Sequence, residues 1–83
     1  MKWTQNNRHT DENRNVFVCD LKEGRKTIAQ IWSYPEKFKP DGKILCFCNA
    51  FCFRKEKPKD QTLEDFKEKM KNYFEDYYKD RIV

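Results

Sequence analysis

Four cysteines and a single histidine are the residues of this chain best suited to bind a metal ion or to act as nucleophiles. A structural zinc site takes four tetrahedral ligands, and its cysteines usually come from two short C-x(2–4)-C turns. Here Cys46, Cys48 and Cys52 follow a C-x-C-x(3)-C spacing, and Cys19 is distant in the sequence. Free cysteine often packs as a small apolar side chain. We therefore expect core thiols and no metal, with zinc on Cys19, Cys46, Cys48 and Cys52 as the alternative.

Catalytic chemistry finds little support in the remaining residues. His9, the single histidine, lies in a polar stretch and follows no recognisable pattern with a nucleophile. Gly24 and Gly42 are the two glycines, too few for a glycine-rich phosphate loop. We expect a protein that is not an enzyme and that uses no cofactor.

The charge of the chain is unevenly distributed. The 83 residues carry a formal net charge of +4, and 39% of them are charged while 16% are aromatic. Residues 1–59 hold 13 basic and 7 acidic side chains (+6), whereas residues 60–83 hold 5 basic and 7 acidic ones (−2). A basic balance attracts anionic partners such as nucleic acid or an acidic protein surface. The length predicts one small domain of marginal stability.

The sequence also predicts a location. It begins with polar residues rather than an apolar signal core, and no run approaches the roughly 18 apolar residues of a membrane span. We expect a cytoplasmic protein that makes no membrane contact, in which the cysteines remain thiols.

The first half of the chain predicts a polar arm and two strands. Residues 1–15 form the arm, in which Trp3 is the one side chain able to pin the chain to a sheet edge. Residues 16–21 and 26–34 alternate as strands do, with a turn at Gly24. In the second strand the alternation places Ile28, Trp32 and Tyr34 on one face, opposite Ala29 and Ile31.

The third predicted strand, residues 43–54, is apolar on both faces. Alternation places Leu45, Phe47, Phe51 and Phe53 on one face and Ile44, Cys46, Cys48, Ala50 and Cys52 on the other. One amphipathic helix cannot cover both faces of such a strand. We expect one of them to meet a partner.

A C-terminal helix is predicted over residues 63–80, with Thr62 as its cap. Its apolar stripe consists of Leu63, Phe66, Met70, Tyr73, Phe74, Tyr77 and Tyr78. The predicted fold is therefore α+β, an antiparallel sheet of three to four strands packed on one helix. Bulky helix side chains fit best over the small side chains of the cysteine face. The reverse, with the phenylalanines under the helix, stays open.

With the cysteine face covered, the partner-binding surface is predicted to consist of Phe47, Phe51, Phe53, Arg54, Lys55 and Lys57. An apolar centre with a polar rim is typical of a protein interface, and two copies of it would form a homodimer. The same aromatic and basic residues resemble one half of the RNA-recognition motif, although no helix separates the first two strands. The alternative function is therefore nucleic-acid binding.

The layout as a whole resembles short phage and mobile-element accessory proteins. The resemblance rests on Trp3, on the strand pair around Gly24 with residues 27–29 (TIA), and on the helix start at residues 62–67 (TLEDFK). It implies a small binder, similar to anti-CRISPR proteins, that inhibits or modulates a host protein or nucleoprotein by occupying its surface. No binding residue carries over, because that group shares no common motif.

Overall fold

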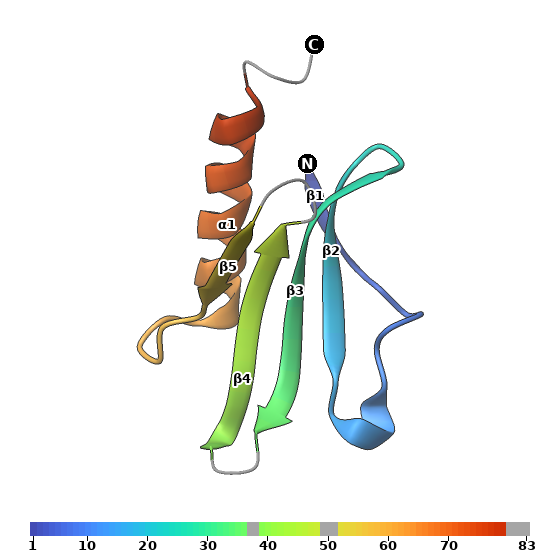
Figure 1. Ribbon diagram of the computed structural model, residues 1–83, viewed down its shortest axis with the longest axis vertical. Helices are drawn as coiled ribbons and strands as arrows, with labels where there is room; N and C mark the ends of the chain where they lie inside the picture. The colour runs from blue at the N-terminus through green and yellow to red at the C-terminus, as the bar shows by residue number, and fades with distance from the viewer. Residues whose placement is uncertain (37–38, 49–51, 80–83) are drawn as a thin grey trace.

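The computed structural model describes residues 1–36, 39–48 and 52–79. Its elements are β1 (Lys2–Gln5), η1 (Glu12–Arg14, a 3-10 turn), β2 (Phe17–Glu23), β3 (Lys26–Glu36), β4 (Lys39–Cys48), β5 (Phe53–Glu56) and α1 (Leu63–Tyr78). The strands form one antiparallel sheet in the order β1-β2-β3-β4-β5, and α1 runs alongside it (Figure 1). The α+β class with a C-terminal helix is confirmed. In the described part of the chain the sheet has five strands rather than three to four.

The additional strand at one edge arises because residues 43–54 are not one strand. The chain reverses after Cys48, and β5 pairs back on β4 with Phe53 opposite Cys48 and Glu56 opposite Leu45. Between the two strands the sequence has neither glycine nor proline, and Asn49 is the one polar residue that interrupts the apolar run, so the turn signal is weak. Reversal brings Phe53 to the helix side, where its ring lies 5.2 Å from that of Phe74. The prediction that Phe53 points away from the helix was wrong.

The other edge strand lies within the expected polar arm. β1 pairs with β2, with Trp3 opposite Leu21. The chain then returns to β2. The backbone amide of Asn6 donates to the backbone carbonyl of Val18 at 2.8 Å, and the backbone amide of Val18 donates to the Thr10 hydroxyl at 3.1 Å. The arm therefore belongs to the fold. Polar side chains hold it by satisfying backbone groups, which an apolar pattern does not reveal.

The core lies between α1 and one face of the sheet. The Thr62 hydroxyl caps α1 by accepting from the Asp65 amide at 3.1 Å. The buried core residues are Leu21, Ile28, Ala29, Ile31, Cys46, Cys48, Phe66, Met70, Phe74 and Tyr78. Cys46 and Cys48 thus lie in the core with the helix, as the fit of small side chains under bulky ones predicts.

Ile28 joins this core although the simple alternation of β3 places it on the opposite face. The register between β2 and β3 shifts at Leu21 and Lys22, so that Leu21 faces Ala29 while Lys22 faces Thr27. Ile28 is the extra residue of this β-bulge. A bulge rotates the side chains on one side of it relative to the other, which brings Ile28 and Ala29 toward the same layer.

Candidate binding face

The face of the sheet opposite α1, called the open face here, carries two cross-strand rows of side chains. Because Leu21, Ile31 and Cys46 point toward the helix, their neighbours along each strand point away from it. One row is Val18, Trp32, Leu45 and Glu56, and the other is Thr4, Asp20, Gln30, Phe47 and Arg54.

Two aromatic rings lie half-buried on the open face. Val18 and Leu45 are buried (0% and 2% exposed), whereas Trp32 between them and Phe47 in the neighbouring row retain partial exposure. Leu45 is opposite Trp32, and Phe47 is two residues further along β4, so the two rings are diagonal neighbours. Such neighbours are roughly 7–8 Å apart, within reach of aromatic side chains. The His9 ring lies 5.6 Å from that of Trp32.

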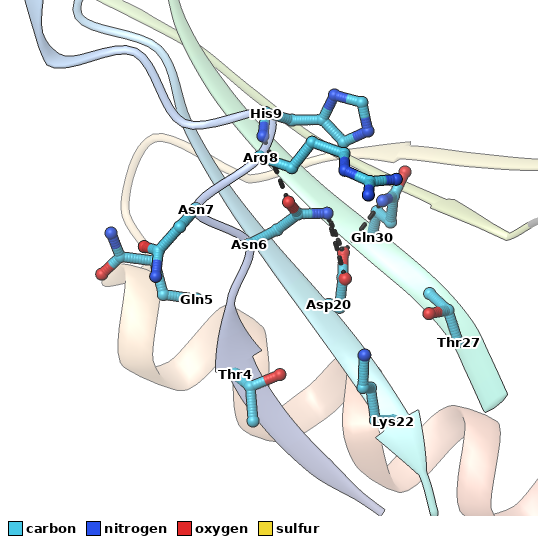
Figure 2. A pocket seen from close by; sticks show the side chains of 10 residues that line it. All are labelled: Thr4, Gln5, Asn6, Asn7, Arg8, His9, Asp20, Lys22, Thr27 and Gln30. Carbon is cyan, nitrogen blue, oxygen red and sulfur yellow. Dashed lines mark hydrogen bonds between the residues drawn. The ribbon is translucent and has the colours of Figure 1, made fainter. Parts of the chain in front are cut away.

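A chain of hydrogen bonds fixes the polar side chains of this face (Figure 2). The side-chain amide of Asn6 donates to both carboxylate oxygens of Asp20 at 3.1 Å, and the side-chain amide of Gln30 donates to Oδ1 of Asp20 at 2.9 Å. The Trp32 indole donates to the Gln30 carbonyl at 3.2 Å. Asp20 is only 7% exposed, so burial makes these bonds costly to lose. The network orients both Gln30 and Trp32.

This network forms part of the wall of a polar hollow of about 520 Å³ between the N-terminal segment and the sheet. The lining residues, all drawn in Figure 2, are Thr4, Gln5, Asn6, Asn7, Arg8, His9, Asp20, Lys22, Thr27 and Gln30. A second hollow of about 410 Å³ shares Arg8 and His9 with the first and extends to Trp32. The second hollow therefore connects the polar hollow to Trp32 on the open face.

The charges on and around the open face are of both signs, because the exposed carboxylate of Glu56 lies on the same edge strand as Arg54. Arg8 and Arg54 are exposed, and Lys22 is half-buried. Asp20, in contrast, is buried and accepts hydrogen bonds from two side-chain amides. The side chains of Arg8, Lys22 and Arg54 attract anions, and the half-buried rings of Trp32 and Phe47 offer a flat contact beside them.

The structure distributes the six predicted partner-binding residues over different places. Phe47 and Arg54 lie opposite each other on the open face. Lys55 pairs with Cys46 and so points to the helix side, like Phe53. Lys57 donates to the carbonyls of Pro58 and Gln61 in the connector before α1. Phe51 lies outside the described residues.

Sequence reasoning missed the functional candidates Trp32, Gln30 and Asp20. The alternation of residues 26–34 did place Trp32 opposite Ala29 and Ile31, which was the available signal. The register that sets Asp20 beside Gln30, and Gln30 beside Phe47, becomes visible only in the assembled sheet.

The four cysteines do not come together as metal ligands. Cys19 and Cys46 both pair with Ile31, from opposite sides, which separates them by two strand spacings or about 9–10 Å. Cys48 donates from its thiol to the Ile28 carbonyl at 3.4 Å, and Cys52 is exposed. Burial, with a smaller contribution from neighbouring Cys48, raises the pKa of the Cys46 thiol to about 12. In the described part of the chain, no cluster of three or more potential metal-binding side chains occurs.

No protein-family model matches the chain, and neither the curated proteins nor the solved structures gave a significant match. Within residues 1–36, 39–48 and 52–79, no helix is sufficiently long and apolar to cross a membrane.

Proposed function

We propose that this protein is a small non-catalytic binding protein and that single-stranded nucleic acid, free or within a nucleoprotein, binds to its open face. The observation that carries the proposal is the pair of half-buried rings, Trp32 and Phe47, on a sheet face that α1 does not cover. Aromatic side chains on an uncovered sheet stack with unpaired bases, and the stacking tolerates any sequence because every base has a π-face.

The surrounding cations suit the phosphates of such a strand. Arg54 lies opposite Phe47 on the neighbouring strand, and Arg8 and Lys22 line the hollow at the other side of the face. A bound strand that stacks on the rings would thus have positive charge on both sides of its path. Electrostatic attraction of this kind falls steeply with salt, because binding releases counterions from the nucleic acid.

The experiment is a titration of a fluorescent 12-nucleotide single strand by anisotropy at two salt concentrations. Three phosphate contacts, through Arg8, Lys22 and Arg54, predict that the logarithm of the affinity falls with the logarithm of salt with a slope of about −2. Phe47→Ala removes one stacking ring and is expected to weaken binding about tenfold or more.

The matched control is Tyr73→Ala, because Tyr73 is also a partly exposed aromatic residue (44%) but lies on α1. It is expected to leave nucleic-acid affinity unchanged. No binding of single strands at low salt, or equal losses in Phe47→Ala and Tyr73→Ala, would overturn the proposal.

A second candidate function is that of a phage-type accessory protein that inhibits a host protein by occupying its surface. The observation that favours it is Phe17, 45% exposed and in one cross-strand row with Ser33 and Ile44. By alternation this row belongs to the helix side of the sheet. It lies at the start of β2, and Figure 1 shows α1 beside the opposite end of that strand. An exposed large apolar side chain suits a protein contact.

The two candidates require different surfaces and so separate cleanly. Phe17→Ser should abolish capture of a host protein while leaving single-strand affinity unchanged, whereas Phe47→Ala should do the reverse. Capture that survives Phe17→Ser would contradict the second candidate.

A further inference from the structure

We propose that the polar hollow around Asp20 is a pocket for one unpaired nucleobase that carries an exocyclic amino group, as cytosine and adenine do. This inference rests on the proposed function and specifies what one part of the open face recognises.

The argument begins with the hydrogen bonds that the wall of the pocket has left to make. A carboxylate accepts about four hydrogen bonds, and Asp20 receives one from Asn6 at each oxygen and one from Gln30 at Oδ1. Its Oδ2 therefore keeps room for a further donor. The side-chain carbonyl oxygen of Gln30 accepts one hydrogen bond from the Trp32 indole, and that of Asn6 accepts one from the backbone amide of His9. Each of these oxygens therefore keeps a second lone pair.

The remaining hydrogen-bonding capacity of this network thus consists mainly of acceptors. A ligand group that satisfies them must donate hydrogen bonds, as the amino group of cytosine or adenine does. Uracil and thymine carry a carbonyl acceptor at the corresponding place and offer one donor, the N3–H, in place of the two N–H bonds of the amino group. They would therefore leave more of these wall acceptors unpaired. An unsatisfied buried polar group costs about 1–3 kcal/mol, which is the basis of the discrimination.

Cations at the same hollow account for the rest of a nucleotide. Arg8 and Lys22 both line it, and Figure 2 shows them on different segments, the N-terminal segment and β2. A phosphate held by either residue would leave the base free to reach Asp20. The volume of about 520 Å³ lies within the range of sites for small organic ligands.

The position of the pocket links it to the stacking rings. Asp20, Gln30, Phe47 and Arg54 follow one another in a single cross-strand row. Gln30 is therefore both a wall residue of the pocket and the neighbour of Phe47. A strand that stacks a base on Phe47 can place a nearby base in the pocket without crossing an intervening element.

The test compares two 12-nucleotide homopolymers, oligo(dC) and oligo(dU), at pH 8 and low salt. These bases differ in the 4-amino group of cytosine and the 4-carbonyl group of uracil, with the matching change at N3. We expect oligo(dC) to bind about tenfold more tightly, since one well-placed base contact discriminates by about 1–3 kcal/mol. The side-chain amide signals of Asn6 and Gln30 in ¹⁵N NMR spectra should shift with dCMP and not with dUMP.

Two variants of the network and one control complete the design. Asp20→Asn replaces one acceptor oxygen by a donor, and Gln30→Met removes the Gln30 acceptor at similar volume in case Asp20→Asn fails to fold. Each is expected to bring the two affinities within twofold of each other. Phe47→Ala should weaken both homopolymers by the same factor and preserve the preference.

Equal affinities of the wild-type protein for both homopolymers would overturn the pocket and leave the proposed function standing. A preference that persists in both network variants would also overturn it. Failure of both homopolymers to bind at low salt would overturn the proposed function and the pocket together.

Discussion

The indole of Trp3 donates a hydrogen bond of 2.9 Å to the backbone carbonyl of Lys67 and so joins the edge strand β1 to the helix α1. These residues are 64 positions apart in the chain. Trp3 is also half-buried against the core cluster. One side chain thus connects the first and last elements of the fold.

Replacing the indole without removing the ring tests this bond. Trp3→Phe keeps most of the apolar contact and loses the donor, and is expected to lower the free energy of unfolding by about 1 kcal/mol. Trp3→Ala loses the packing as well and should cost more. Urea unfolding followed by circular dichroism measures both. An unchanged stability in Trp3→Phe would show that the bond contributes nothing.

The two glycines offer a matched pair of backbone substitutions. Both have positive φ, +61° at Gly24 and +70° at Gly42, where any other residue is strained by about 1–2 kcal/mol. A Cβ at Gly24 meets open space, whereas a Cβ at Gly42 would lie 2.7 Å from the Tyr34 carbonyl oxygen. Gly42→Ala should therefore destabilise clearly more than Gly24→Ala. Equal losses of thermal stability would contradict the close approach of β3 and β4 at this point.

The thiols are expected to differ in reactivity toward iodoacetamide. Cys52 is exposed and should be alkylated first, while Cys46 is fully buried and its raised pKa of about 12 keeps it protonated. The thiolate is the reactive form, so Cys46 should react only after unfolding. Mass spectrometry of peptides after timed alkylation gives the order, and early labelling of Cys46 in the folded protein would argue against its place under α1.

The same pKa predicts a loss of stability in alkaline solution. The Cys46 thiol titrates near its ordinary value of 9.0 in the unfolded chain and near 12 in the folded protein. Above pH 9 the unfolded chain releases this proton and the folded protein keeps it, so the free energy of unfolding falls as pH rises toward 12. Below pH 9 the residue has no such effect.

A Cys46→Ala variant supplies the control for this pH effect. It is less stable below pH 9 because it leaves a gap in the core, but its stability should fall less steeply between pH 9 and pH 10.5. Denaturant unfolding at several pH values measures the two slopes. Parallel slopes in the variant and the wild type would contradict the prediction.

Local signals were sufficient for some elements of this fold. The cap at Thr62 and the stripe that includes Phe66, Met70 and Phe74 define α1 within a single segment, since capping and helical periodicity are properties of neighbouring residues. The hairpin between β2 and β3 follows from Gly24, whose positive φ suits a two-residue loop.

Other features had only a weak local signal. The reversal after Cys48 interrupts an apolar run in which Asn49 is the one turn-forming residue, and Phe53 changes faces as a result. The expected patch of Phe47, Phe51, Phe53, Arg54, Lys55 and Lys57 assumed that residues 43–54 form one continuous strand. Because β5 pairs back on β4, Phe53 and Lys55 lie on the helix side of the sheet and Phe47 lies on the open face.

The sequence by itself determined the α+β class and the capped C-terminal helix, because these depend on periodicity and capping. It favoured the cysteine face beneath the helix by side-chain size but left the reverse open. Only the tertiary structure decided the composition of the open face. Asn6, Asp20 and Gln30 come from three separate segments, and polar residues carry no periodic pattern that predicts which of them will meet. Strand register brings them together, and register is set by the burial of the whole sheet against α1.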